Sequence, residues 1–202
     1  MMVEAAYIQK IRPRKKDSHK GDYGHVLILA GSVGMTGAAY LSSQAALLSG
    51  SGLVTLGIPA SLNPIMEIKL TEVMTLPLEE TRQQSLRGAS EQKILDFAGK
   101  VDAVAIGPGL SQNKDTQSLV RSLVKKLDKP IVLDADGLNA YEGKADELKD
   151  RDNLLVITPH PGEMSRLVNK SIDEIQDSGN RSQKRPRSDL MRSSYLKDSI
   201  LS

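Results

Sequence analysis

Alternation between apolar runs, glycine- or proline-containing turns and helical periods constrains the fold of this sequence most strongly. Residues 25–30, HVLILA, form an apolar run; a glycine-rich loop follows, and residues 38–49 then carry apolar side chains at helical spacing. The same order recurs at residues 101–127, 130–140 and 154–168. Continuous apolar runs are typical of parallel strands buried on both faces. The repeated β-then-α order therefore predicts an α/β fold with a mostly parallel, doubly wound sheet flanked by helices.

The segment between the second strand and the next helix is ambiguous. Residues 53–58 read as a strand, but residues 60–86 show no single period. Residues 60–70 could form a helix with Pro64 near its start, because proline is tolerated in the first turn of a helix. Residues 73–78 could form a short strand.

Two later helices have candidate N-caps. Ser90 precedes the helical pattern EQKILDFAG, and Asp115 begins the pattern DTQSLVRSLVKKL. Serine and aspartate side chains accept hydrogen bonds from the free N–H groups of a first helical turn. We therefore predict that Ser90 and Asp115 cap these helices.

Composition argues against several classes of protein. Lys and Arg number 27 against 25 Asp and Glu, and aromatic residues are 3% of the chain with no Trp, which disfavours a nucleic-acid partner. The chain has no cysteine, so disulfides and thiolate chemistry are excluded. The first residues lack the apolar core of a signal peptide. No run approaches the roughly 18 apolar residues of a membrane span. We expect a soluble, cytoplasmic protein without a membrane partner.

Four strands end in turns of unusual composition. Ligands of open parallel sheets bind beyond the carboxyl ends of the strands, so these turns should share one rim. The turns are GSVGMTG from Gly31, GPG from Gly107, DADGLN from Asp134 and TPHPGE from Thr158.

The glycine turns alone are not specific. The turn from Gly31 to Gly37 opens a helix, so its N–H groups could face an anion or a dinucleotide. It is not a P-loop, because no Lys-Ser/Thr pair follows, and it lacks the Gly-x-Gly-x-x-Gly spacing. A tight β–α turn explains it equally well. Gly109 could allow a positive φ angle or the close approach of a ligand.

The two aspartates after residue 133 allow several roles. Asp134 and Asp136 could bind metal-bound phosphate or a ribose, and one of them could cap the following helix. We favour Asp136 as the cap and Asp134 as the site-facing residue. Asn139 could point either way.

His160 stands between two prolines, which restrict the backbone and hold the imidazole in one orientation. It could donate a hydrogen bond to a ligand, or it could be a turn residue bonded to the backbone. Glu163 could reach a magnesium ion through water. We favour the ligand interpretation, because the other three turns should lie on the same rim.

Taken together, these pieces resemble the ADP/ATP-dependent NAD(P)H-hydrate dehydratase family over roughly residues 11–175. The SHKGDYG and TPHPGE segments are specific to the resemblance, and the glycine turns are not. The matching pieces are residues 17–59, DAVAIGPGL (102–110), PIVLDADGLNA (130–140) and VITPHPGEMSRL (156–167).

The resemblance implies a ribokinase-like fold and repair of the hydrated cofactors NADHX and NADPHX. In the family, ADP or ATP with Mg²⁺ phosphorylates the added hydroxyl, and loss of phosphate restores NADH or NADPH. Carried over by position, Ala38, Gly109 and His160 would contact the hydrate substrate. Glu163 resembles the acidic end of a metal-associated element. Relatives are commonly tetrameric, so a homo-oligomer is expected.

The chain departs from the family pattern near its C-terminal end. Family members continue to a Lys-Gly-x-x-Thr segment and a Gly-Ser-Gly-Asp turn whose aspartate is the acid/base, and neither motif occurs here. We expect a partial dehydratase domain at 1–176 and a divergent, disordered tail at 177–202. A frameshift or altered splice near Asp177 is one hypothesis. The catalytic residue is thus unknown, one side of the sheet should be uncovered, and we predict little activity.

Two other functions fit the same pattern. One is a small-molecule kinase of the ribokinase-like superfamily, which SHKGDYG and TPHPGE disfavour. The other is a non-catalytic fragment that binds a nicotinamide nucleotide or a full-length subunit.

Overall fold

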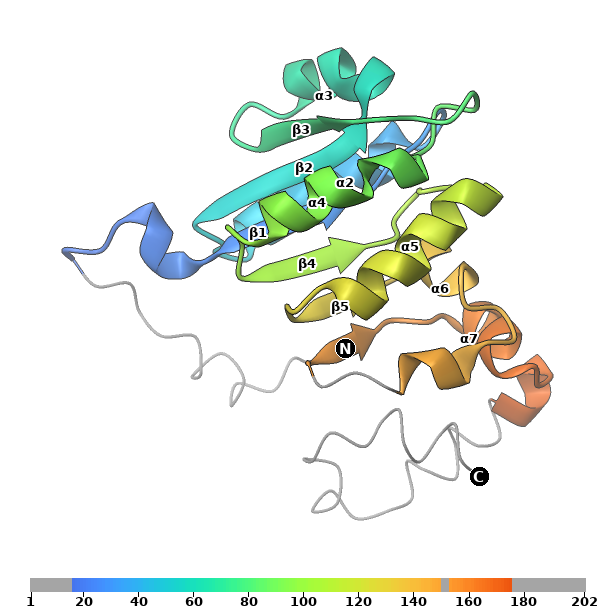
Figure 1. The fold of residues 1–202 in the computed structure, drawn as a ribbon. Helices are drawn as coiled ribbons and strands as arrows, with labels where there is room; N and C mark the ends of the chain where they lie inside the picture. Colours follow the sequence, from blue (N-terminus) through green and yellow to red (C-terminus); the bar gives the residue numbers. More distant parts are fainter. Residues whose placement is uncertain (1–15, 150–152, 176–202) are drawn as a thin grey trace.

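The computed structural model describes residues 16–149 and 153–175, and its centre is a six-stranded sheet in the order β3-β2-β1-β4-β5-β6 (Figure 1). Every adjacent pair of strands is parallel. The predicted α/β class is confirmed, while the predicted tail lies outside the described residues. The strands are β1 (His25–Leu29), β2 (Leu53–Pro59), β3 (Met74–Leu78), β4 (Ala103–Ile106), β5 (Ile131–Leu133) and β6 (Leu155–Ile157).

Helices connect successive strands, and short 3₁₀ turns accompany them. The α-helices are α2 (Thr36–Leu48), α3 (Asn63–Lys69), α4 (Glu91–Ala98), α5 (Lys114–Lys126), α6 (Asp136–Asn139) and α7 (Pro161–Val168). The 3₁₀ turns are η1 (Lys20–Tyr23), η2 (Ala60–Leu62), η3 (Gly88–Ser90) and η4 (Ala145–Leu148). Among the described residues, no helix is long and apolar enough to cross a membrane.

The ambiguous segment contains both of the elements that its sequence allows. It contains the helix α3, in which Pro64 occupies the first turn, and the edge strand β3. Pro77 lies within β3, which agrees with the tolerance of proline on edge strands.

The two predicted caps need correction. Asn113, not Asp115, is the N-cap of α5, and its side chain accepts a hydrogen bond from the Asp115 backbone nitrogen at 2.9 Å. Ser90 does occupy the N-cap position of α4 but makes no capping bond. Its hydroxyl donates instead to the Glu79 carbonyl at 3.0 Å.

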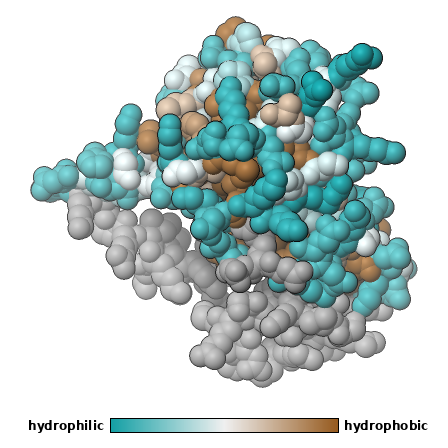
Figure 2. Space-filling view, in the orientation of Figure 1, coloured by the Kyte–Doolittle hydropathy of each residue, from teal (hydrophilic) through white to brown (hydrophobic). Residues whose placement is uncertain are grey.

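Successive residues of a strand contribute side chains to two separate hydrophobic cores, one on each face of the sheet, because side chains alternate between the faces. Leu27 and Leu29 of β1 belong to a large cluster with residues of α4, α5 and η4. Ile28 belongs to a smaller cluster with residues of α2 and α3. In Figure 1, α4 and α5 lie in front of the sheet. Figure 2 shows that the outer surface on that side is mainly hydrophilic, with a hydrophobic area near its middle. We call the sheet face under α4 and α5 the closed face.

The opposite face is covered unevenly. Ile28, Ala105, Val132 and Val156 are register partners across β1, β4, β5 and β6, so their side chains share one face. Ile28, near α2, is 1% exposed, whereas Val132 is 40% and Val156 is 42% exposed. This agrees with the prediction that one side of the sheet is uncovered. We call the part of this face over β4, β5 and β6 the open face.

Candidate functional site at the carboxyl rim of the sheet

Hydrogen bonds join the loop after β1 to the loop after β4. The Gly31 backbone nitrogen donates to the Pro108 carbonyl at 2.9 Å. The Ser32 hydroxyl, in a residue that is 2% exposed, donates to the Gly109 carbonyl at 2.8 Å. The two glycine turns therefore form one fixed unit, as expected for loops on one rim.

Ala38 and Gly109 lie close together in this unit. Gly109 has a φ angle of +67°, and a Cβ atom placed there would lie 3.1 Å from the Ala38 Cβ and 2.8 Å from the Met35 Cβ. The sequence left open two reasons for a glycine at position 109, a positive φ angle and a close approach. Both apply, and the close approach is to residues of the protein itself. Of the three predicted substrate residues, these two are neighbours.

A second set of bonds ties the loop after β4 to the loop after β5. Asp136 is not the cap of α6, contrary to our prediction, because Ala135 holds the N-cap position with a φ angle of 48°. Instead, the Asp136 carboxylate accepts from the Ser111 backbone nitrogen at 2.9 Å and from Asn139 Nδ2 at 3.0 Å. Ser111 was missed by sequence reasoning, since only the sheet order brings it to Asp136, 25 residues away.

The loop after β5 is in turn tied to the loop after β6. Thr158 Oγ1 donates to Asp134 Oδ1 at 2.7 Å. Arg166 Nε of α7 donates to Asn139 Oδ1 at 3.1 Å, which adds a second connection and shows which way Asn139 points. The rim therefore consists of four loops bonded in series, from Gly31 to His160.

His160 is the N-cap of α7. Its Nδ1 atom accepts from the backbone nitrogens of Gly162 at 3.0 Å and Glu163 at 3.3 Å, so the ring hydrogen lies on Nε2. Nε2 is 3.2 Å from Glu163 Oε1, and the His160 side chain is 61% exposed. The interpretation of His160 as a turn residue bonded to the backbone thus describes its contacts. The contact with a ligand stays a prediction that the exposed side of the ring allows.

Glu163 takes part in the same N-terminal cap of α7. Its side chain is 8% exposed; Oε2 accepts from the His160 backbone nitrogen at 2.9 Å, and Oε1 faces the imidazole. Within residues 16–149 and 153–175, no group of three or more His, Cys, Asp or Glu side chains could hold a metal ion. These residues do not form a magnesium site of their own, and the metal role of Glu163 stays a prediction.

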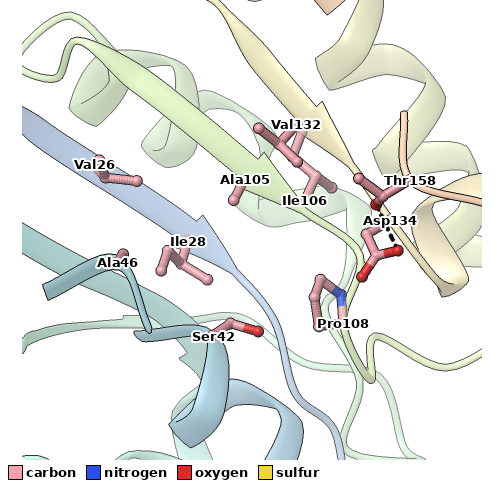
Figure 3. Close-up of a pocket in the computed structure, with 10 residues that line it drawn as sticks. All are labelled: Val26, Ile28, Ser42, Ala46, Ala105, Ile106, Pro108, Val132, Asp134 and Thr158. Atoms are coloured by element: carbon pink, nitrogen blue, oxygen red, sulfur yellow. Dashed lines mark hydrogen bonds between the residues drawn. The ribbon is translucent and has the colours of Figure 1, made fainter. Parts of the chain in front are cut away.

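A cavity of about 600 Å³ opens beside the rim (Figure 3). Ser42, Pro108, Asp134 and Thr158 line its mouth, where the strands end, as we favoured for Asp134. None of the three predicted substrate residues lines the cavity itself, but each is near a residue that does. Pro108 precedes Gly109, Thr158 lies two residues before His160, and the Ser42 hydroxyl donates to the Ala38 carbonyl at 2.9 Å. The remaining lining residues are Val26, Ile28, Ala46, Ala105, Ile106 and Val132.

Comparison with known proteins identifies the family. A model of the NAD(P)H-hydrate dehydratase family matches residues 26–197. The chain belongs to this family. The dehydratase match extends through the predicted domain boundary at 176, so the divergent nature of residues 177–202 stays a prediction.

The curated relatives of this chain are longer proteins. The bifunctional NAD(P)H-hydrate repair enzyme of Moorella thermoacetica is 42% identical over 177 residues, which are 87% of this chain and 33% of that protein. The enzyme of the same name from Thermofilum pendens is 39% identical over 166 residues, 82% of this chain and 32% of that protein. The chain thus spans about a third of the length of the curated relatives that it matches.

Solved structures confirm the ribokinase-like fold of this chain. An ADP/ATP-dependent NAD(P)H-hydrate dehydratase from Bacillus subtilis, co-crystallized with ATP/Mg²⁺, has a TM-score of 0.67 and 29% identity and covers 89% of this chain and 60% of its own. A ribokinase-like superfamily protein from Enterococcus faecalis has a TM-score of 0.71 at 20% identity, covering 90% of this chain and 61% of its own. The resemblance that we inferred from the SHKGDYG and TPHPGE segments is therefore confirmed.

Proposed function

We propose that this chain binds the hydrated nicotinamide of NADHX or NADPHX at the carboxyl rim, as part of an ADP/ATP-dependent NAD(P)H-hydrate dehydratase. One observation carries the proposal: the turns of Ala38 and Gly109 pack directly together and are bonded in series to the turn of His160. Family membership supplies the substrate class. Because the chain spans only about a third of the length of that relative, the complete reaction belongs to the proposal.

The reaction has two steps, and neither of them needs an oxidant or a reductant. The hydroxyl oxygen on the hydrated ring attacks the terminal phosphorus of ATP or ADP; its proton is removed and ADP or AMP leaves. The ring C–O bond then breaks, phosphate departs, and loss of a proton from the adjacent carbon restores the ring double bond. Catalysis of the first step depends mainly on the positioning of the phosphoryl group and on stabilisation of its charge.

The residues of this chain serve the substrate rather than the phosphoryl group. The small residues Gly109 and Ala38 bring the loop after β4 close to the first turn of α2, and we place the hydrated ring at the surface that these two segments share. His160 offers the exposed edge of an imidazole that the α7 cap holds in place. Strand spacing puts the β6 turn about 10 Å from the β4 turn, a distance that a nicotinamide riboside can bridge.

A nucleotide is the second substrate in this proposal. The B. subtilis neighbour was co-crystallized with ATP/Mg²⁺, which supports ADP or ATP with Mg²⁺ for this family. The printed sequence contains neither the Lys-Gly-x-x-Thr nor the Gly-Ser-Gly-Asp motif. We therefore propose that this polypeptide binds the hydrate but turns it over poorly by itself, since a missing general base alone costs about a hundredfold or more. Cytoplasmic location and a homo-oligomer stay part of the proposal.

Titration of NADHX into the chain, followed by calorimetry, tests the rim directly. His160→Asn keeps a side-chain acceptor for the α7 cap but removes the imidazole, so it should weaken NADHX binding at least tenfold and leave thermal unfolding unchanged. His160→Ala should weaken binding and also lower stability by about 0.5–2 kcal/mol. Wild-type affinity in His160→Asn would contradict the assignment of His160.

His19 provides a matched control at the other end of the sheet. It is the N-cap of η1, its backbone nitrogen donates to Asp22 Oδ2 at 2.9 Å, and its Nε2 atom lies 3.5 Å from Asp22 Oδ1. His19→Asn should therefore leave NADHX binding unchanged. Turnover is measured separately, as recovery of reduced-nicotinamide absorbance from NADHX with ADP or ATP and Mg²⁺. A rate equal to that of the B. subtilis enzyme would contradict the proposed low activity.

A further inference from the structure

Met35, in the loop after β1, does not follow the usual preference at the start of a helix. It holds the N-cap position of α2 but makes no side-chain hydrogen bond there. Ser, Thr, Asp and Asn are favoured at this position because their oxygens accept from the first N–H groups of the helix, whereas a thioether is a weak acceptor. The helices α5 and α7 have such acceptors in Asn113 and His160. A methionine before α2 is therefore not explained by helix capping.

Packing accounts only for the first carbon of the Met35 side chain. A Cβ atom placed at Gly109 would lie 2.8 Å from the Met35 Cβ, a contact that an alanine at position 35 would make equally well. Met35 is 53% exposed and belongs to neither hydrophobic core. The thioether thus serves neither a cap nor a core. Residues that depart from a local preference without a gain in stability are expected at functional sites.

The backbone of Met35 is held in place by hydrogen bonds. Its nitrogen donates to the Ser32 carbonyl at 2.9 Å, and its carbonyl accepts from the Ala38 nitrogen at 3.1 Å. Ser32 is itself bonded to the Gly109 carbonyl at 2.8 Å. The Met35 side chain therefore begins at a fixed point, between the two segments whose shared surface is the proposed place of the hydrated ring.

We propose that the Met35 side chain lies against the face of the hydrated nicotinamide ring and contributes to its recognition. This inference rests on the proposed function, because that function places the ring at this surface. Addition of water saturates two ring carbons, so the ring presents apolar C–H groups beside its hydroxyl. A methionine side chain is flexible and polarisable, which lets it follow an irregular apolar surface. Met35 supplies an apolar contact, and His160 a polar one.

Calorimetric titration of NADHX into Met35→Ser tests this contact. Full burial of a methionine side chain corresponds to roughly ten- to a hundredfold in affinity, so covering its exposed half corresponds to about four- to tenfold. Met35→Ser should therefore weaken NADHX binding about four- to tenfold. Its thermal midpoint should stay within about 2 °C of wild type, because the side chain is outside both cores and serine is a better N-cap.

Two further variants and a second ligand sharpen the test. Met35→Leu keeps an apolar side chain of similar volume, so its affinity for NADHX should stay within about twofold of wild type. Met74→Ser is the matched control, since Met74 is 44% exposed but begins β3, at the amino end of the sheet and away from the rim. It should leave NADHX binding unchanged. ADP-ribose, which lacks the ring, should bind wild type and Met35→Ser equally.

Unchanged NADHX affinity in Met35→Ser, together with a loss in His160→Asn, would overturn the Met35 contact and leave the proposed function intact. An equal loss of ADP-ribose affinity would also overturn the contact, since the side chain would then touch another part of the dinucleotide. Weaker binding accompanied by a markedly lower thermal midpoint would show a packing role instead. A wild-type chain without affinity for NADHX would overturn both proposals.

Discussion

The closed and open faces of the sheet are built from the same strands but differ in what covers them. On the closed face, Ile131 and Leu133 are nearly inaccessible under α5 and α6, whereas Val132 between them is 40% exposed. All three residues are apolar and β5 reads as one continuous run. The difference shows that a buried-strand pattern specifies two apolar faces, while burial of each face depends on a separate element of the chain.

The largest expected difference between the faces is in core packing. Leu123 of α5 is 0% exposed on the closed face, so Leu123→Ala should lower the free energy of unfolding by about 2–5 kcal/mol through a cavity. Val132→Ala should cost less than about 1 kcal/mol, because the side chain is already partly hydrated. Urea denaturation measures both values. Equal losses would mean that the open face is covered in solution.

Buried hydroxyl groups give an intermediate test. Thr116 of α5 is 0% exposed; its Oγ1 atom donates to the Leu86 carbonyl at 2.7 Å and lies 2.9 Å from Ser85 Oγ. Ser43 of α2 is also 0% exposed, but within the described residues its Oγ atom has no hydrogen-bond partner. Thr116→Val should cost about 1–3 kcal/mol, whereas Ser43→Ala should change stability by less than about 0.5 kcal/mol or increase it.

Thermal and urea unfolding of the two variants measure this difference. A loss in Ser43→Ala as large as in Thr116→Val would show that Ser43 has a partner in solution. The buried hydroxyl groups of α2 and α5 would then not differ in hydrogen bonding.

The smallest expected effect lies on the outer surface of the closed face, where the Lys126 ammonium of α5 donates to the Glu91 carboxylate of α4. This hydrogen bond, with a second one from Ser122, holds the pKa of Glu91 below its ordinary value of 4.5. The stabilisation is therefore present above pH 4.5 and is lost as the pH falls through the lowered pKa. Lys126→Met should cost less than about 1 kcal/mol at pH 7.

Urea unfolding of Lys126→Met across pH 3 to 7 checks the sign. The difference from wild type should shrink toward the acid end, because protonated Glu91 cannot pair with an ammonium. A difference that grows on acidification would contradict the assigned pair.

The sequence predicts the layers of this fold well and its helix starts less well. Strands and helices follow from local periods, whereas the exposure of Val132 and Val156 cannot be told from the uniformly apolar strands that contain them. The capping errors arise because Asn113 and Asp115 are both good N-cap residues two positions apart, so a local pattern cannot choose between them. Asp136 was misassigned since its partner, Ser111, is distant in the chain.

The rim shows the same limit from the functional side. The carboxyl ends of parallel strands predict that the turns of Gly109 and His160 share an edge, and the serial hydrogen bonds of that edge agree. The sequence could not tell that His160 Nδ1 is occupied by α7 or that Glu163 is bonded to His160. Those contacts depend on the exact residue at which α7 begins. The two prolines around His160 indicate the region of that start but not the residue.

Gly37, the second residue of α2, precedes the predicted substrate contact Ala38, and a Cβ atom there would meet nothing within 4 Å. Because the chain has no cysteine, Gly37→Cys would give a uniquely addressable thiol beside the rim. A fluorophore attached to it would report arrival of a nicotinamide as an optical signal, without any change to the bonded loops. The open space at Gly37 thus allows ligand binding at the rim to be followed by fluorescence.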